Sequence, residues 1–391
     1  MDILYISSLS SEDKIKSIHK RNGDNPGFAV QKFNRLLVKG FILNNINIKT
    51  FSNPPITAYN WKEKVVNFKD EKENDILYKY VPFINIPLIK HICIFIYSFF
   101  YVFFWGQNGS KKKVIICDIL SISMCMGAML ASKLKRIRSV GILTDMPGYM
   151  MSSEKSIFSK LTTIINMSYI NSFSYYIFLT EEMNFKVNKN KRPYLVMEAI
   201  CDSIINVNQS NTEKSNPRTI LYAGGLYEKY GLKMLVDAFL QSKVDARLVI
   251  YGSGPYEKEL LKICSLHPNV EYRGVALNAT ILEEESKSYI LVNPRFTTEE
   301  FTKYSFPSKN IEYMASGTPL LTTKLPGMPK DYYPYVFFFS EETVDGYAKS
   351  ISDIFDLSED LLLQKGLAAK NYVLEYKNNK KQVRRIIDMI S

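Results

Sequence analysis

The stretch SFPSKNIEYMASGTP, residues 305–319, predicts one strand–loop–helix–strand unit around which the rest of the chain can be organised. Its tripeptide FPS, 306–308, is typical of a loop that runs into a helix, and Gly317 is a typical helix stop. Apolar runs on either side, 289–293 and 319–323, are typical of buried strands. In such a unit the loop lies at the carboxyl end of the first strand, where open α/β sheets bind ligands.

The start of this predicted helix is a candidate phosphate site. N-terminal amides and the positive end of the helix dipole favour an anion there. Lys309 in the first turn opposes the dipole unless an anion is present, and Glu312 is one turn further on, within reach of a hydroxyl beside a phosphate. A capped surface helix with a solvated lysine and glutamate fits the same spacing equally well, so both interpretations stay open.

Length and charge narrow the class of protein. With 391 residues the chain is long enough for two domains, each with its own core. The formal net charge of +11 favours an anionic partner. Because no nucleic-acid-binding motif accompanies the basic residues, phosphorylated substrates and anionic lipid are better candidates than DNA or RNA.

Cysteine usage and the N-terminus indicate the compartment. The five cysteines include no CxxC pair, which argues against a zinc site and favours a reducing cytosol. No signal peptide is expected, because Met1 and Asp2 lead directly into the strand-like segment ILYISS.

Strand-like and helix-like segments alternate along the chain, which predicts an α/β fold of parallel sheets with helices on both faces. An apolar run at 3–8 is followed by a polar stretch, 10–26, expected to be a strand-to-helix loop, and then by a helix at 28–43. The expected division is a first domain, 1–205, a polar linker, 206–217, a second domain, 218–375, and a C-terminal helix, 376–391, that could cross back to the first domain. The two domains are expected to be doubly wound, Rossmann-like and to face each other across a cleft.

The most apolar segment, 84–105, allows two interpretations. Its uninterrupted part, 92–105, is short for a membrane span and is flanked by Lys90, His91 and the lysines at 111–113. A helix lying in an anionic membrane surface is one interpretation, and a buried core helix of the first domain is the other. The buried helix is slightly preferred, and the two interpretations are compatible, since one face of the helix could pack in the core while the other meets the membrane surface.

Loops that follow the strands of the second domain could hold a diphosphate. They offer glycines for close backbone approach, cations for phosphate charge and a carboxylate for a ribose. Taken alone, each of these residues more often belongs to a turn or carries a solvated charge. Their joint occurrence at successive strand ends is a more specific sign of a binding site. They are Gly224, Gly225, Lys229, Lys233, Gly252, Gly254, Arg273, Gly274, Val275, Arg295, Lys303 and Glu312.

In the first domain, Asp145 follows the predicted strand 139–143. A carboxylate at the carboxyl end of a sheet strand could orient or activate an acceptor hydroxyl. Capping of the next turn explains the same position, and both interpretations stay open.

Several common enzyme classes are excluded by missing motifs. The glycine-rich turn at 224–225 lacks the GxGxxG pattern of dinucleotide-binding folds, and no GxxxxGK[ST] sequence marks a P-loop. No GxSxG, HExxH or protein-kinase motif occurs either.

With those classes set aside, the sequence resembles the GT-B glycosyltransferases, specifically the retaining family-4 group of bacterial capsule, exopolysaccharide and O-antigen assembly. The resemblance is clearest over the second domain, through ILYAGG (220–225), EKYG (228–231), FPSKNIEYMASGTP (306–319) and LPGMP (325–329). In the first domain it rests on shorter stretches, among them NPG at 25–27 and TDMP at 144–147.

The resemblance implies a nucleotide-diphosphate sugar bound mainly by the second domain. Glu312 would hold the ribose hydroxyls, Ser308 and Lys309 would receive the diphosphate, and the loop 273–275 would line the base. Tyr304 stands where the group has a first glutamate, so Glu299, Glu300, Lys303 or Arg295 would contact the donor sugar instead.

Cations and acceptor-side residues follow from the same resemblance. Lys229 and Lys233 are the nearest substitutes for the basic residues that usually follow the glycine-rich turn. Asn25, Gly27 and Asp145 would lie on the acceptor side, and the residues implied in catalysis are Asp145, Lys309 and Glu312. No metal and no cofactor are expected, because no DxD-type site is evident and the group is usually metal-independent.

The function implied is transfer of a sugar, with retention, from a nucleotide-diphosphate donor to a saccharide acceptor in cell-surface polysaccharide assembly. Basic patches and the segment 92–105 favour a lipid-linked acceptor and a cytoplasmic protein held peripherally at the inner face of the cell membrane. Nucleic acid is not an expected partner. Two alternatives stay open: a nucleotide-sugar epimerase of GT-B fold, and, because of Tyr304, a non-catalytic nucleotide-sugar-binding or scaffold protein.

Overall fold

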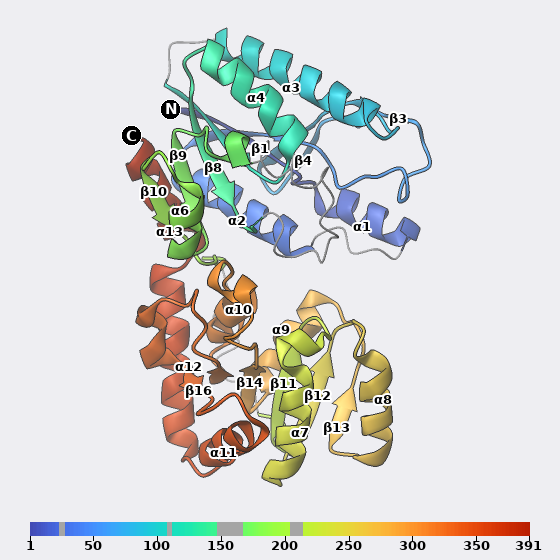
Figure 1. Cartoon of the computed structure of the whole chain (residues 1–391), viewed down its shortest axis with the longest axis vertical. Coiled ribbons are helices and arrows are strands. Elements are labelled where there is room, and N and C mark those ends of the chain that lie inside the picture. The colour runs from blue at the N-terminus through green and yellow to red at the C-terminus, as the bar shows by residue number, and fades with distance from the viewer. Residues whose placement is uncertain (23–27, 108–111, 147–166, 204–213) are drawn as a thin grey trace. The chain divides into compact units, whose positions relative to one another are not determined.

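Two separate parallel β-sheets organise the chain, one in each of two units (Figure 1). The computed structural model describes residues 1–22, 28–107, 112–146, 167–203 and 214–391. The first unit comprises Met1–Ile200 and Asn379–Ser391, and the second comprises Cys201–Asn378. Each unit has its own cluster of buried apolar side chains.

The sheet of the first unit has eight strands in the order β10-β9-β8-β7-β1-β2-β5-β4, and only the β4–β5 pair is antiparallel among these neighbours. The chain starts in the middle, at β1, and builds outward in both directions. A two-stranded sheet, β3–β6, lies beside it. The strands are β1 (Asp2–Ser7), β2 (Asn47–Ser52), β3 (Val65–Val66), β4 (Glu71–Glu73), β5 (Ile76–Tyr80), β6 (Phe83–Ile84), β7 (Lys113–Asp118), β8 (Arg138–Leu143), β9 (Tyr175–Phe178) and β10 (Tyr194–Val196); the helices are α1 (Glu12–Asn22), α2 (Phe28–Leu43), α3 (Ile89–Gln107), α4 (Ile122–Leu134), α6 (Glu181–Val187) and α13 (Asn379–Ile390).

The sheet of the second unit is parallel throughout and has six strands in the order β13-β12-β11-β14-β15-β16. It is also wound in both directions from its first strand, which confirms the prediction of two doubly wound, Rossmann-like domains. Its strands are β11 (Thr219–Ala223), β12 (Arg247–Tyr251), β13 (Val270–Tyr272), β14 (Ile290–Asn293), β15 (Leu320–Thr322) and β16 (Phe337–Phe338); its helices are α7 (Leu232–Ser242), α8 (Glu257–Leu266), α9 (Asn278–Lys287), α10 (Ser308–Ser316), α11 (Val344–Phe355) and α12 (Glu359–Tyr376), with 3-10 helices η2 (Glu228–Tyr230), η3 (Glu300–Lys303) and η4 (Lys330–Tyr335).

The polar stretch 10–26 is not the loop that its composition predicts, because most of it forms α1. Ile15 and Ile18 are buried on one side of this helix, and the hydroxyl of Ser11 accepts a hydrogen bond from the Lys14 amide at its start. Two apolar residues one turn apart are enough to dock a helix onto a core when its other side chains stay in water.

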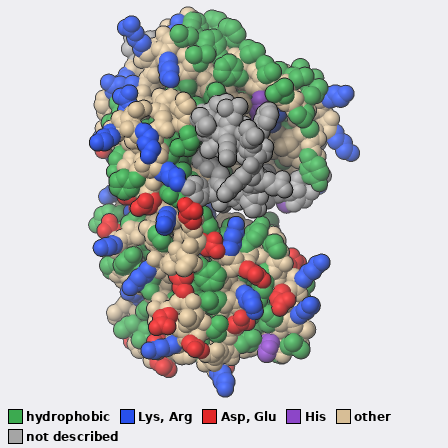
Figure 2. Space-filling view, viewed as in Figure 1, with side chains coloured by type: hydrophobic (Ala, Val, Ile, Leu, Met, Phe, Trp, Pro, Cys, Tyr) green, Lys and Arg blue, Asp and Glu red, His purple; other side chains and the backbone are tan. Residues whose placement is uncertain are grey.

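The helix at 92–105 is not the fully buried core helix that was slightly preferred, because only one of its faces packs on the core, as the combined interpretation allowed. In α3 the buried residues are Ile94, Ser98 and Val102, and 17% of its most apolar 18-residue window is buried. Hydrophobic composition predicted burial, but the spacing of the buried residues leaves the opposite side of the helix exposed. Figure 2 shows hydrophobic side chains gathered over α3 and α4 in the first unit. By length and composition this helix could also cross a membrane.

The last helix, α13, belongs to the first unit although the chain reaches it from the second. It packs against α2, where a Cβ placed on Gly40 would lie 2.5 Å from the Asn379 carbonyl oxygen. Figure 1 shows the C-terminus close to β10 within that unit. The expected linker, 206–217, lies largely outside the described residues, which resume at Lys214.

Candidate functional site

The middle of the second sheet contains the point where the strand order reverses. From β11 the chain proceeds to β12 and β13 on one side and then returns to β14 and β15 on the other. In open α/β sheets ligands bind in the crevice outside the carboxyl ends of the strands at this point. Gly224 and Gly225 follow β11 there, and Arg295 follows β14.

The glycine loops after β11, β12 and β13 are joined by backbone hydrogen bonds. The Gly224 amide donates to the Tyr251 carbonyl (3.0 Å), and the Gly252 amide donates to the Gly274 carbonyl (2.8 Å). Gly252 has φ +137°, and a Cβ placed on it would lie 1.8 Å from the Gly224 carbonyl oxygen. Similarly, a Cβ on Gly254 would lie 2.5 Å from the Leu226 carbonyl oxygen. The glycines therefore let the backbones of three loops meet in one rim.

Helix α10 is held against this rim by Tyr313. Its buried hydroxyl accepts a hydrogen bond from the Ala223 amide (2.8 Å) and lies 3.2 Å from the Ala223 carbonyl oxygen, to which it donates. In the first turn Asn310 accepts a hydrogen bond from Asn293 (2.5 Å), at the end of β14. These contacts place the start of α10 beside the ends of β11 and β14. The first amides of α10, which the sequence predicts to bind an anion, therefore lie at the switch point. The N-cap residue, Pro307, offers no side chain to cap them.

Lys309 is already engaged by two carboxylates. Its ammonium nitrogen lies 3.5 Å from Oε1 of Glu285 in α9 and is ion-paired with Glu312. Burial alone would lower the pKa of Lys309, but the charges of Glu312 and Glu285 outweigh it and raise the pKa. The lysine that seemed unfavourable at a helix start therefore has protein anions beside it. Lys309 therefore fixes the position of Glu312. Contact between Lys309 and a diphosphate remains a prediction.

Glu285 was missed by the sequence reasoning. Its side chain is fully buried. It is the last of three consecutive glutamates and looks like part of a solvated acidic run. One signal was available: Glu285 follows the buried Ile281 by four residues, which places it on the same face of α9.

Among the predicted cations, Arg295 is best placed for an anionic ligand. Its side chain is half-buried, and its guanidinium carbon lies 4.6 Å from the centroid of the Tyr230 ring. Burial lowers the pKa of Arg295, and Tyr230 and Tyr222 oppose that shift. No ion pair to Arg295 occurs within the described part of the chain. By contrast, Lys233 is exposed and paired with Asp237 at 3.2 Å.

Four more of the predicted donor-site residues are Lys229, Lys303, Tyr304 and Ser308. Lys229 is exposed, 5.7 Å from the Tyr230 ring and 5.6 Å from the Phe301 ring. Lys303 and Ser308 are exposed, and Tyr304 is half-buried.

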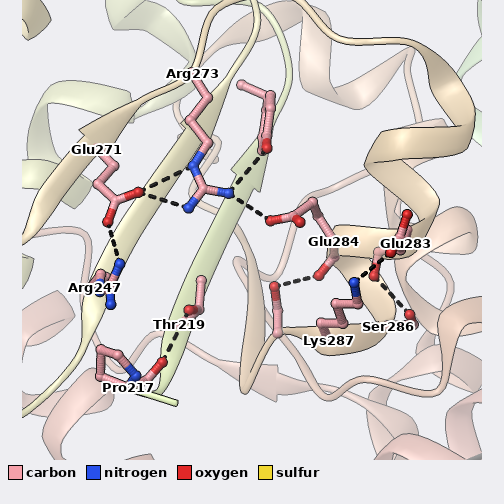
Figure 3. A network of polar contacts seen from close by, with 11 residues as sticks. Pro217, Thr219, Arg247, Glu271, Arg273, Glu283, Glu284, Ser286 and Lys287 are labelled. Carbon is pink, nitrogen blue, oxygen red and sulfur yellow. Dashed lines mark hydrogen bonds and ion pairs between the residues drawn. The ribbon is translucent and has the colours of Figure 1, made fainter. Parts of the chain in front are cut away.

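The side chain of Arg273, whose loop was expected to line the base, is engaged by other side chains of the protein (Figure 3). Its guanidinium lies 2.7 Å from Glu271 and 2.8 Å from Glu284, and it also donates to the Tyr251 hydroxyl. Burial alone would lower the pKa of Arg273, but the hydrogen bonds and charges of Tyr251 and Glu271 raise it. The side chain braces the loop between β13 and α9. A base would therefore meet the backbone of Gly274 and the exposed side chain of Val275.

The first sheet has its own switch point, between β1 and β7, and Asp118 ends β7 there. Asp118 is buried, and its Oδ1 accepts a hydrogen bond from the Leu120 amide (3.2 Å). Burial raises the pKa of Asp118 to about 6; the Leu120 amide and Asn34 oppose the shift, and the charge of Asp145 adds to it.

Asp145, the predicted acceptor-side carboxylate, follows β8 and is half-buried. Burial raises its pKa, and a hydrogen bond with Thr144 opposes the shift. The structure thus brings Asp145 close enough to Asp118 for their charges to interact, and the sequence reasoning did not single out Asp118. The signal for Asp118 was that an acidic residue interrupts an otherwise apolar run. The other two acceptor-side predictions, Asn25 and Gly27, lie outside the described residues.

We expect Asp118→Asn to remove a pH dependence of stability. Because the pKa of Asp118 is higher in the folded than in the unfolded state, the native protein binds more protons between about pH 4 and 6. Wild-type stability therefore falls as the pH rises through that window, by about 3 kcal/mol at most. Urea unfolding of both proteins at pH 4.5 and 7 measures the difference. Asp13→Asn, at an exposed position, is the matched control and should behave as wild type. Parallel pH profiles for Asp118→Asn and wild type would contradict the assignment.

No group of three or more His, Cys, Asp or Glu side chains suited to a metal ion occurs among the described residues. The predictions that no metal and no cofactor are needed stay predictions.

Comparisons with known proteins agree with this geometry. Residues 217–356 match the family model Glycosyl transferases group 1, which confirms the resemblance found in the sequence. Similar solved structures include the lipopolysaccharide outer core galactosyltransferase WaaB (15% identity, TM-score 0.61), Anabaena Alr3699/HepE in complex with UDP (14%, 0.64) and the trehalose-6-phosphate synthase OtsA (11%, 0.68). Each comparison covers 100% of this chain and 99% of the other. No curated protein sequence matches. The structural similarity shows that the chain has the GT-B fold.

Proposed function

We propose, from the match of residues 217–356 to the group 1 glycosyl transferases, that the protein transfers a sugar from a nucleotide-diphosphate donor to a saccharide acceptor. The observation that supports this most directly is the half-buried guanidinium of Arg295, which has no ion pair in the described residues. It follows β14 at the switch point, beside the glycine rim and the start of α10. Even a half-buried cation without a carboxylate partner loses hydration, and an anionic ligand bound there would offset that cost.

The donor would lie across the switch point of the second unit. Amides at the start of α10 and the guanidinium of Arg295 would bind the diphosphate, since both favour negative charge. Glu312, held in place by Lys309, would accept hydrogen bonds from ribose hydroxyls. Glycines at positions 224, 225, 252 and 254 would let the backbone approach the nucleotide closely.

The reaction would break the bond between the sugar's anomeric carbon and the diphosphate oxygen and form a bond to the acceptor oxygen. Negative charge grows on the leaving diphosphate, where Arg295 and the helix dipole stabilise it without a metal ion. The proton of the acceptor hydroxyl leaves to the departing phosphate or to Asp145, the carboxylate predicted on the acceptor side. Retention of anomeric configuration is proposed from the sequence resemblance.

The nucleotide and the acceptor class are proposed from the relatives. Alr3699/HepE was solved with UDP, and the pneumococcal O-GlcNAc transferase GtfA with UDP and GlcNAc, which supports uridine diphosphate as the leaving group. WaaB is named for the lipopolysaccharide outer core, which supports a role in cell-surface polysaccharide assembly on a lipid-linked saccharide.

A nucleotide-sugar panel tests the proposal. Purified protein is incubated with each donor, with EDTA present, with and without a membrane lipid extract. Acceptor-dependent release of nucleoside diphosphate is expected. Tight binding of a nucleotide sugar without turnover on any acceptor would favour the non-catalytic alternative that Tyr304 suggests. Interconversion of the donor without an acceptor would favour an epimerase.

We expect Glu312→Ala to weaken binding of the nucleoside diphosphate by about 10- to 100-fold, because charge-assisted hydrogen bonds to ribose are lost. The fold should persist, since Lys309 keeps Glu285 as a partner. Isothermal titration calorimetry measures the dissociation constant. Glu283→Ala, which removes an exposed carboxylate paired with Lys287, is the control and should change binding by less than about twofold. Equal affinities of Glu312→Ala and wild type would remove Glu312 from the site.

A further inference from the structure

The backbone segment that carries Arg295 is held by side-chain hydroxyls. At the end of β14, three consecutive carbonyl oxygens each accept a hydrogen bond from a different buried hydroxyl. The pairs are Thr322 with Asn293 (3.0 Å), Tyr347 with Pro294 (3.1 Å) and Thr323 with Arg295 (2.5 Å). Just beyond them, the Thr297 amide donates to both carboxylate oxygens of Glu342, each at 3.0 Å. The segment is therefore fixed by contacts that depend on particular side chains.

Two of these bonds restrict the backbone on both sides of the Arg295 Cα. A residue has only two soft backbone torsions, because the peptide groups on either side of it are planar. The bond to the Pro294 carbonyl fixes the peptide plane before Arg295, and the bond to the Arg295 carbonyl fixes the plane after it. The direction in which the side chain leaves the backbone is therefore set by Tyr347 and Thr323.

The same segment is tied to the ring beside which the guanidinium lies. Gly231 follows Tyr230 in the chain and has φ +78°, and a Cβ placed on it would lie 1.9 Å from the Pro294 carbonyl oxygen. Only glycine lets the two backbones approach this closely. The guanidinium carbon of Arg295 lies 4.6 Å from the centroid of the Tyr230 ring. Arg295 and the ring of Tyr230 are thus held in fixed positions relative to each other.

We infer that Thr323 and Tyr347 are positioning residues for Arg295, because their hydroxyls hold its guanidinium where the donor diphosphate would bind. The inference rests on the proposed function, in which Arg295 binds that diphosphate. A cation stabilises developing charge best when it is held in place before the reaction, since no free energy is then spent on reorienting it. In this role each hydroxyl acts through the backbone of Arg295 rather than by contact with the ligand.

A purely structural role explains the same bonds, since a buried backbone carbonyl needs a hydrogen-bond partner wherever it lies. The two explanations differ in what they predict. A structural role lowers stability and leaves the ligand affinity of the folded protein unchanged. A positioning role lowers the affinity for a diphosphate, and only while residue 295 is arginine.

Calorimetric titration with nucleoside diphosphates tests the inference without relying on turnover. Wild type is titrated with UDP, ADP, GDP and dTDP, and the tightest ligand is used for the variants. Thr323→Val and Tyr347→Phe each remove one hydroxyl, and Thr323→Ser keeps it. Thr219→Val is the matched control, because it removes a buried hydroxyl that donates to the Pro217 carbonyl (3.3 Å) at the opposite, amino end of the sheet. Each substitution is also made in the Arg295→Ala background, and urea unfolding reports the stability of every protein.

With arginine at position 295, Thr323→Val and Tyr347→Phe should each weaken binding by about 5- to 20-fold, because a displaced guanidinium loses charge-assisted hydrogen bonds to the diphosphate. Thr323→Ser and Thr219→Val should stay within about twofold of wild type. In the Arg295→Ala background Thr323→Val should have no further effect, because the group that it positions is absent.

Two results would overturn this inference alone. One is an equal loss of affinity from Thr323→Val in both backgrounds, and the other is wild-type affinity in both Thr323→Val and Tyr347→Phe. A failure of the donor site itself has a different signature: Arg295→Ala then binds as tightly as wild type, or none of the four nucleotides binds. Either of those outcomes would refute the proposed donor site and this inference with it.

Discussion

Arg295→Ala is expected to lower kcat/KM for sugar transfer by about 100- to 1000-fold, which corresponds to roughly 3–4 kcal/mol of lost transition-state stabilisation. The guanidinium is half-buried at the switch point of the second sheet and has no ion pair among the described residues. Charge grows on the diphosphate as the glycosidic bond breaks, so the loss should fall mainly on kcat. Steady-state kinetics with the donor found in the panel assay measures both constants.

Two further variants show whether the guanidinium itself matters. Arg295→Lys keeps the charge but loses the planar group that stacks on Tyr230, so it should recover only part of the activity. Lys233→Ala is the control, because this exposed lysine is paired with Asp237 on its own helix and should change kcat/KM by less than about twofold. If Arg295→Ala and Lys233→Ala have the same kinetics, Arg295 does not stabilise the leaving group.

The parts of the fold that local patterns determine were predictable from the sequence. Parallel strands buried on both faces are continuous apolar runs, so β1, β8, β14 and β15 were found close to their observed bounds. The helix at 308–316 was found because its proline start and glycine stop are local signals. The loops at the carboxyl ends of these strands then followed from topology alone.

Other features depend on contacts between distant residues, which a single sequence does not record. Glu285 and Lys309 meet because α9 and α10 pack together. Arg295 stands apart from Lys229 and Lys233 as a candidate cation because its side chain is half-buried, and no residue type reveals that. The exposure of α3 depends on which side faces α4 and the sheet, whereas hydrophobicity alone predicted a core helix.

The same reasoning explains why the first unit gave fewer site residues. Asp118 ends β7, and Asp145 follows the adjacent strand, β8. The register of the sheet brings the ends of these two strands together. Asp145 was found because a turn-like sequence follows it. Asp118 was missed because the apolar run continues into Ile119, which hides the end of the strand.

Lys309→Met is expected to lower the free energy of unfolding by about 3–5 kcal/mol, because it leaves the fully buried Glu285 without its cation. Urea unfolding followed by circular dichroism measures the change. The two tryptophans, Trp61 and Trp105, are both in the first unit, so tryptophan emission separately follows the unit that lacks the substitution.

The double variant Lys309→Met/Glu285→Gln separates the buried charge from other effects of the lysine. Removing both charges should restore at least half of the lost stability, since a neutral amide costs less to bury than a carboxylate whose neighbouring ammonium has been removed. Lys287→Met is the control: it breaks an exposed ion pair with Glu283 on the same helix as Glu285 and should cost less than about 0.5 kcal/mol. Equal stabilities of Lys309→Met and Lys287→Met would show that Lys309 does not compensate Glu285. If the double variant regains stability but not sugar transfer, Lys309 also serves the reaction, through its hold on Glu312 or its own contact with the diphosphate.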